Sequence, residues 1–303
     1  MALKTSLIER ASAYNLVGLL QARVALRASI AGRDKTTPPM REVSDITVPG
    51  AVDERPARLY RPATAPPAGG PALIYFHGGG FVVGELDTND ALCRRLASAA
   101  GLTLIAVHYR LVPEAPFPAQ LDDTLAAMRW IADHADTLGI AHGRIAIGGD
   151  SAGGYLAIAA TAVLNAETPG AIAAQILIYP LLHIDDDIWS QSVFKHSRIV
   201  GRAAVAYIRS QLGEGAMHTP SLLNQDLPPP PPTLIAMGGA LDPVRPDAEA
   251  YARKIEAAGA APVILEYPPL PHGFANLTHV SAASRKAMAE IGEAAGKLLR
   301  GEG

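Results

Sequence analysis

The stretch Gly148–Gly154, which reads Gly-Gly-Asp-Ser-Ala-Gly-Gly, constrains the fold of this chain more than any other. An apolar run, Arg144–Ile147, comes before it, and an Ala-rich helical run at 155–160 follows it. A strand that enters a helix through Gly-x-Ser-x-Gly forms a nucleophile elbow, where glycines make room for a serine with a strained backbone. The turn lifts the hydroxyl to a helix N-terminus, which favours negative charge. A Gly-rich turn alone looks similar, but the flanking strand and helix favour Ser151 as a nucleophile.

Composition excludes several other classes of protein. The chain has 303 residues, 49% of them hydrophobic and 18% charged, and a formal charge of −3, which is typical of one large globular domain. We expect no nucleic-acid partner, because no basic excess is present, and no membrane partner, because no apolar run is long enough to span one. Glu9 and Arg10 interrupt the region where a secretory signal would be apolar. The single cysteine, Cys93, is interpreted as a buried hydrophobe on a helix, and we expect a cytoplasmic protein.

Short apolar runs alternate with helical ones from residue 72 onward, after an antiparallel pair predicted at Asp45–Val48 and Ala57–Tyr60. The later strands are predicted at Ala72–Phe76, Thr103–Tyr109, Arg144–Gly148, Ala174–Tyr179, Thr233–Met237 and Val263–Tyr267. Helices are predicted near Asp87–Ala99, Gln120–Leu138, Ala152–Ala166, Asp247–Ala258 and Ser281–Leu299. Such alternation indicates a parallel sheet with helices on both faces.

Two segments depart from the alternation. Residues 5–31 have helical spacing and precede the first strand, so they form either a lid or a helix packed on the domain. About fifty residues between Tyr179 and Thr233 hold a polar loop, His183–Asp187, and one predicted helix, Arg202–Leu212. A connection this long usually carries function, and we interpret it as a second lid element.

A serine hydroxyl becomes a good nucleophile only when a base takes its proton and an acid orients that base. In chains with a nucleophile elbow the acid follows the serine, the histidine comes last, and both lie on loops after strands. Asp242 and His272 meet these conditions. Each has another interpretation, a turn aspartate before proline and a surface histidine, but their order and positions favour a triad with Ser151.

The tetrahedral intermediate of acyl transfer also needs N–H donors for its oxyanion. The run His77–Phe81 follows the predicted strand Ala72–Phe76, and its glycines let the backbone approach a substrate closely. The amide of Ala152, directly after the serine, is expected to complete the oxyanion hole.

Five motifs together resemble the bacterial hormone-sensitive-lipase-like esterases, a branch of the α/β-hydrolase superfamily. These motifs are His77–Gly80, Tyr109–Glu114, Gly149–Gly154, Asp242–Arg245 and His272–Phe274. The resemblance implies an α/β-hydrolase fold, with a mostly parallel sheet of about eight strands, flanking helices and a helical cap. It implies that Ser151, Asp242 and His272 form the triad, and that Gly79, Gly80 and Ala152 donate to the oxyanion.

The resemblance also implies how the chain is divided. Residues 1–40 and 183–218 would form the cap, and residues 41–182 and 219–303 the two parts of the core. Structural roles are implied for His77, Arg110, Glu114 and Asp150, which would hold the glycine loop and the elbow. Two residues depart from the family's pattern. Pro246 replaces a usual acidic residue, and Val112 replaces a usual alanine.

We therefore expect hydrolysis of carboxylic esters with short to medium acyl chains, through an acyl-enzyme and without a cofactor. The expected binding partner is a small-molecule ester, and the oligomeric state considered for the chain is a homodimer. An amidase or formamidase would use the same residues, and a non-catalytic small-molecule receptor of this fold would lack His272. No metal is expected, because the nearest candidate ligands, His183 with Asp185–Asp187, are better interpreted as a solvated acidic loop.

Large apolar residues beside the catalytic motifs are expected to line the acyl pocket. They are Phe81, Val83, Leu182 and Phe274, with Leu181 next to them. Phe274 could equally belong to the core.

Overall fold

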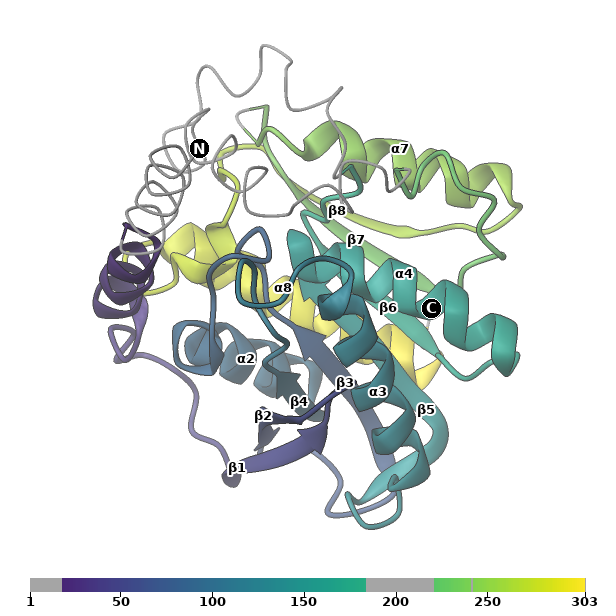
Figure 1. Cartoon of the computed structure of the whole chain (residues 1–303), viewed down its shortest axis with the longest axis horizontal. Helices are drawn as coiled ribbons and strands as arrows, with labels where there is room; N and C mark the ends of the chain where they lie inside the picture. Colours follow the sequence, from purple (N-terminus) through teal and green to yellow (C-terminus); the bar gives the residue numbers. More distant parts are fainter. Residues whose placement is uncertain (1–17, 184–220, 241, 303) are drawn as a thin grey trace, which may run out of the picture.

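The computed structural model describes residues 18–183, 221–240 and 242–302, and within these ranges eight strands form a single sheet (Figure 1). Their order across the sheet is β1-β2-β4-β3-β5-β6-β7-β8. β2 runs antiparallel to β1 and β4, and all other neighbours are parallel. The strands are β1 (Glu42–Pro49), β2 (Glu54–Arg61), β3 (Gly70–Phe76), β4 (Thr103–Val107), β5 (Ile140–Asp150), β6 (Ala174–Ile178), β7 (Thr233–Gly238) and β8 (Val263–Tyr267).

Helices cover both faces of the sheet, which explains why its central strands are mostly apolar. The helices are α2 (Leu86–Ala100), α3 (Ala119–Asp133), α4 (Ala152–Glu167), α7 (Arg245–Ala257), α8 (Ala282–Arg300) and the short 3₁₀ helix η2 (Phe274–Asn276). α2 packs on α8 behind the sheet in Figure 1, and α3 packs on α4 in front of it. Every residue of β4, β6 and β7 is buried, whereas β1, at one edge, alternates between more and less exposed residues.

Within the described residues, the predicted order of strands and helices is confirmed, and most boundaries agree within two residues. The helix predicted at Gln120–Leu138 is wrong at its end, because α3 stops at Asp133. There the ring of His134 turns back to bond the carbonyl of Trp130, and turns follow as far as Gly139. β5 begins at Ile140, four residues earlier than predicted. Cys93 is buried on α2, as expected.

The two predicted lid segments are only partly described. Residues 18–30 are helical and lie beside the carboxyl ends of the strands, and residues 1–17 fall outside the described ranges. Of residues 183–218, the predicted second part of the cap, only His183 is described, so the helix predicted at Arg202–Leu212 also falls outside the described ranges. Among the described helices, none combines the length and apolar character needed to cross a membrane.

Candidate active site

Ser151 lies at the sharp turn between β5 and α4, where the sequence predicted a nucleophile elbow. Its φ of 51° falls in the left-handed region, and its amide donates to the carbonyl of Ile178 at 3.0 Å. The crossing of strand and helix is so close that a Cβ on Gly153 would lie 1.9 Å from the carbonyl oxygen of Phe76. Glycine is therefore required at this position, and the strained serine projects its hydroxyl above the sheet.

Asp242, His272 and Ser151 form one hydrogen-bonded chain. Asp242 follows β7 and His272 follows β8, so adjacent parallel strands bring them to the same edge of the sheet. His272 Nδ1 lies 2.9 Å from Asp242 Oδ1, and His272 Nε2 lies 3.0 Å from Ser151 Oγ. A carboxylate only accepts, so the neutral ring carries its proton on Nδ1 and leaves Nε2 free to accept from the serine.

The charge state of His272 depends on two opposing effects. Burial lowers the pKa of His272, but the attraction of the Asp242 carboxylate and its hydrogen bond raise it, and the net result is a pKa above the ordinary 6.5. Asp242 is itself almost completely buried, and its Oδ1 also accepts the amide of Val244 at 3.0 Å. A general base at this position needs a buried carboxylate that orients its ring and favours its protonated form.

The glycine run after β3 curls over the serine. Gly79 has a φ of 120°, and a Cβ there would lie 2.1 Å from the carbonyl oxygen of Val83, so only glycine fits. Within the described residues, nothing accepts from the amides of Gly79, Gly80 and Ala152. These are the three amides predicted from the sequence to form the oxyanion hole. Gly79 and Gly80 line the cavity at Ser151, and Ala152 directly follows the serine.

Asp150 links the glycine run to the nucleophile elbow through hydrogen bonds. Its Oδ1 accepts the amide of Gly78 at 2.8 Å and the hydroxyl of Tyr75 at 2.9 Å, and Tyr179 approaches its Oδ2 at 3.5 Å. Burial raises the pKa of Asp150 above its ordinary value, although the bonds from Gly78 and Tyr75 oppose that effect. The carboxylate thus connects the loop that precedes the oxyanion donors to the residue before the serine.

Two other polar residues of the resemblance also have defined contacts. Arg110 binds both oxygens of Asp123, each at 2.8 Å, and Asp123 is completely buried. Burial acts to raise the pKa of Asp123, but the bonds from Arg110 and from backbone amides lower it overall. Glu114 forms an ion pair with Arg23 of the N-terminal helical segment.

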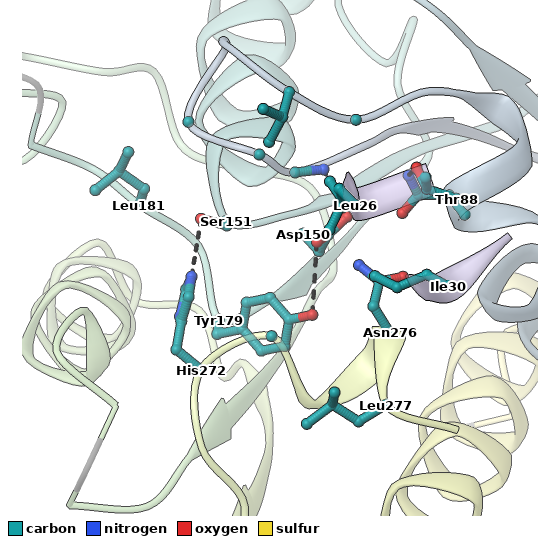
Figure 2. Close-up of a pocket in the computed structure, with 17 residues that line it drawn as sticks. Leu26, Ile30, Thr88, Asp150, Ser151, Tyr179, Leu181, His272, Asn276 and Leu277 are labelled. Atoms are coloured by element: carbon teal, nitrogen blue, oxygen red, sulfur yellow. Dashed lines mark hydrogen bonds between the residues drawn. The ribbon is translucent and has the colours of Figure 1, made fainter. Parts of the chain in front are cut away.

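A cavity of about 280 Å³ opens at Ser151 and His272 (Figure 2). Its lining comes from the glycine loop, the elbow, the N-terminal helical segment, α2 and the region after His272. The lining residues are Leu26, Ile30, Gly78, Gly79, Gly80, Val83, Gly84, Thr88, Asn89, Asp150, Ser151, Tyr179, Leu181, His272, Gly273, Asn276 and Leu277. The walls are largely apolar and the reactive groups stand at one side, an arrangement suited to an uncharged organic substrate.

Val83 lines this cavity, but three other residues predicted for the acyl pocket do not. Phe81 is fully buried and packs edge-on against Phe117 and Tyr155. Leu182 and Phe274 are also fully buried.

These three assignments are corrected, and each has a physical reason. Phe81 has a φ of 66°, and its ring packs in the core instead of lining the cavity. Leu181 lines the cavity, and its neighbour Leu182 is buried. Phe274 starts η2 and packs against Tyr179 and Tyr267, as its core interpretation required.

Sequence reasoning missed several residues around the site. Leu26 and Ile30 lie four residues apart on the N-terminal helical segment, and that spacing could have identified them as one face. Asp247 was missed as well. Its carboxylate accepts the amides of Leu182 and His183 and bonds the His183 ring, and so holds the chain where the predicted second lid segment begins.

Pro246 occupies the first turn of α7, where a missing N–H costs nothing. Among the described residues, no group of three or more His, Cys, Asp and Glu side chains is arranged to hold a metal ion.

Comparison with known proteins agrees with this geometry. Residues 73–276 match the model of a family described as having the alpha/beta hydrolase fold. The chain is 37% identical to esterase LipI of Mycobacterium tuberculosis over 82% of its length and 80% of the relative's. It is 35% identical to the carboxylic ester hydrolase LipN of the same organism, over 82% of this chain and 69% of LipN. A crystallised esterase of Pyrobaculum calidifontis superimposes with a TM-score of 0.84 at 33% identity, covering 94% of both chains.

Proposed function

Since the chain belongs to the α/β-hydrolase fold family, and within it to the hormone-sensitive-lipase-like esterases, we propose that it hydrolyses carboxylic esters with short to medium acyl chains through a Ser-His-Asp triad. The observation that carries this proposal is the chain of contacts from Asp242 through His272 to Ser151, which ends at the cavity. The relatives named as esterases support the same reaction class.

In acylation, Ser151 Oγ attacks the ester carbonyl while its proton passes to His272 Nε2. The carbonyl oxygen becomes an oxyanion, which the amides of Gly79, Gly80 and Ala152 would bind because their N–H groups are not used elsewhere among the described residues. His272 then gives its proton to the leaving alkoxide, and the alcohol departs from an acyl-enzyme on Ser151.

In deacylation, a water molecule takes the place of the alcohol. His272 accepts a proton from the water as it attacks the acyl carbonyl, and the same amides bind the second oxyanion. The tetrahedral intermediate expels Ser151, which recovers its proton from His272, and the carboxylic acid leaves. Asp242 keeps the imidazole oriented and stabilises its charged form throughout.

The size of the cavity supports a limit on the length of the substrate's acyl chain. Its volume of about 280 Å³ lies near the lower end of ligand pockets, which span roughly 300–1,000 Å³. Each methylene buried there contributes about 0.8 kcal/mol until the space is filled. We therefore expect kcat/KM to rise from acetate to butyrate or hexanoate and then to fall.

The test is a series of p-nitrophenyl esters from acetate to palmitate, measured beside the matching anilides. A maximum at short or medium chains supports the proposal, and a kcat/KM that rises through palmitate contradicts the chain-length limit. Good turnover of anilides with poor turnover of esters would identify an amidase instead. The control is Ser151→Ala, which should lose several orders of magnitude in kcat at unchanged thermal stability and resist labelling by an organophosphonate.

A further inference from the structure

A pair of histidines lies behind the oxyanion loop, which comprises residues 78–82, and outside the triad. His77 directly follows β3 and is almost completely buried, and His108 directly follows β4. His77 Nδ1 lies 2.8 Å from the carbonyl oxygen of Gly78, and His77 Nε2 lies 3.0 Å from His108 Nδ1. The His77 ring is stacked on Tyr109 at 4.5 Å between centroids, which limits its rotation.

The contacts of this pair determine where its protons are. A carbonyl oxygen only accepts, so His77 Nδ1 carries a proton. Burial, and then repulsion from His108, lower the pKa of His77 to about 3, so at neutral pH the ring is uncharged and its Nε2 has a lone pair. Burial, with repulsion from Arg55 and Arg23, lowers the pKa of His108 to about 4. His108 is therefore neutral too, and its Nδ1–H is the donor that His77 Nε2 requires.

The acceptor of the His77 proton is half of a peptide group that also contains an oxyanion donor. The carbonyl of Gly78 and the amide N–H of Gly79 belong to one planar trans unit and point in opposite directions. Holding the Gly78 oxygen on the His77 side therefore turns the Gly79 N–H away from His77. The preceding peptide group is held as well, by Tyr109 on the His77 carbonyl at 2.7 Å and by Asp150 on the Gly78 amide.

We propose that His108 is a positioning residue for the oxyanion hole: its Nδ1–H fixes His77 in the tautomer that holds the Gly78 carbonyl and aims the Gly79 amide at the reacting carbonyl. This inference rests on the proposed function. Accepting a proton at Nε2 also makes the Nδ1–H of His77 a stronger donor, because hydrogen bonds in a chain polarise one another. Without His108 the His77 proton is free to move to Nε2, which would place the Nδ1 lone pair against the Gly78 oxygen.

The kinetic test compares His108→Leu, which removes the donor, with His108→Asn, whose amide nitrogen can replace Nδ1–H. Loss of a whole oxyanion donor costs about 10²–10³ in kcat, so misaiming one should cost about tenfold. We expect H108L to lower kcat about tenfold at unchanged KM. It should also weaken the binding of butaneboronic acid, a mimic of the tetrahedral intermediate, by the same factor. H108N should restore both. Arg55→Lys, which keeps the positive charge beside His108 but removes the Nε contact to the His108 carbonyl, is the matched control and should leave kcat within twofold.

Equal losses in H108L and H108N, or a rise in KM at constant kcat, would overturn the proposal. A second measurement does not depend on activity or on the folding of H108L. Ring ¹⁵N shifts of histidine-labelled wild-type protein, assigned with a His77→Gln sample, should show His77 protonated at Nδ1 and bare at Nε2. The opposite tautomer would refute the inference even if ester hydrolysis is established, and the predicted tautomer would support it even if the substrate class is wrong.

Discussion

Replacing Arg23 with methionine should loosen the N-terminal helical segment from the active site. The guanidinium of Arg23 donates to the carbonyl of Val82 at 2.8 Å, to that of Val112 at 3.0 Å, and to both oxygens of Glu114. It thus joins the helical segment to the end of the oxyanion loop and to the loop after β4. Methionine keeps much of the apolar stem and removes every one of these bonds.

The magnitude follows from the exposure of the groups. The side chain of Glu114 is 50% exposed, so its ion pair with Arg23 is counted at no more than about 1 kcal/mol. The two bonds to carbonyl oxygens are charge-assisted and partly buried, and each contributes about 1.5 kcal/mol, the lower end of the usual range. The loss is therefore about 3–4 kcal/mol, which raises the undocked fraction of the segment by a factor of about 10² to 10³. Undocking would remove Leu26 and Ile30 from the cavity wall.

Hydrogen–deuterium exchange of the peptide covering residues 18–30, and the p-nitrophenyl ester series, together measure this effect. We expect at least tenfold faster exchange in R23M and a weaker preference among acyl chain lengths. Arg33→Met is the matched control, because within the described residues the Arg33 side chain bonds only the carbonyl of Ala28 in its own segment. If R23M and R33M exchanged at the same rate and kept the same ester profile, Arg23 would not hold the wall of the cavity.

Three further predictions follow from the site. The profile of kcat/KM should fall as pH decreases through a pKa above 6.5, because Asp242 raises the pKa of His272 against the effect of burial and only the neutral ring accepts the serine proton; an acid limb below that value would contradict this assignment. Tyr75→Phe should lower the free energy of unfolding by about 1–3 kcal/mol, since buried Asp150 loses a hydrogen-bond donor. Thermal denaturation measures this loss, and an unchanged stability would show that the bond contributes nothing. Dialysis against EDTA should leave kcat unchanged, because the triad supplies nucleophile and base, and activity that returned only with zinc would exclude this mechanism.

The sequence predicted the order of strands and helices and the positions of Ser151, Asp242 and His272. Both could be predicted because the place of each residue depends on the strand that it follows in the chain. A residue directly after a parallel strand must lie at the carboxyl edge of the sheet, whatever its side chain contacts. Ser151, Asp242 and His272 each follow a strand that is apolar enough to be identified, and β7 and β8 are neighbours in both sequence and sheet. The identity of the three residues then limits the chemistry.

The acyl pocket could not be predicted in the same way. Neighbouring residues on an extended segment point to opposite sides, and a motif does not specify which of them faces the cavity. Leu181 and Leu182 show this, because the first lines the cavity and the second is buried. Phe81 was misassigned because a positive φ beside the glycine run turns its ring into the core. The apolar wall comes from Leu26 and other residues far away in sequence, whose positions depend on tertiary contacts such as those of Arg23.

The oxyanion loop shows where residues that control this site without touching the substrate should be sought. Glycines let the loop approach a carbonyl closely, but they have no side chains to hold their own peptide groups, and they lose the most conformational freedom on folding. The order of the loop must therefore come from outside it. Tyr109 binds the carbonyl of residue 77, Asp150 the amide of residue 78, His77 the carbonyl of residue 78 and Arg23 that of residue 82. These donors and acceptors come from four separate parts of the chain, and three of them lie outside the cavity lining. Substitutions that lower kcat while leaving KM unchanged should accordingly be found behind the glycine loop, among residues that never contact the ester.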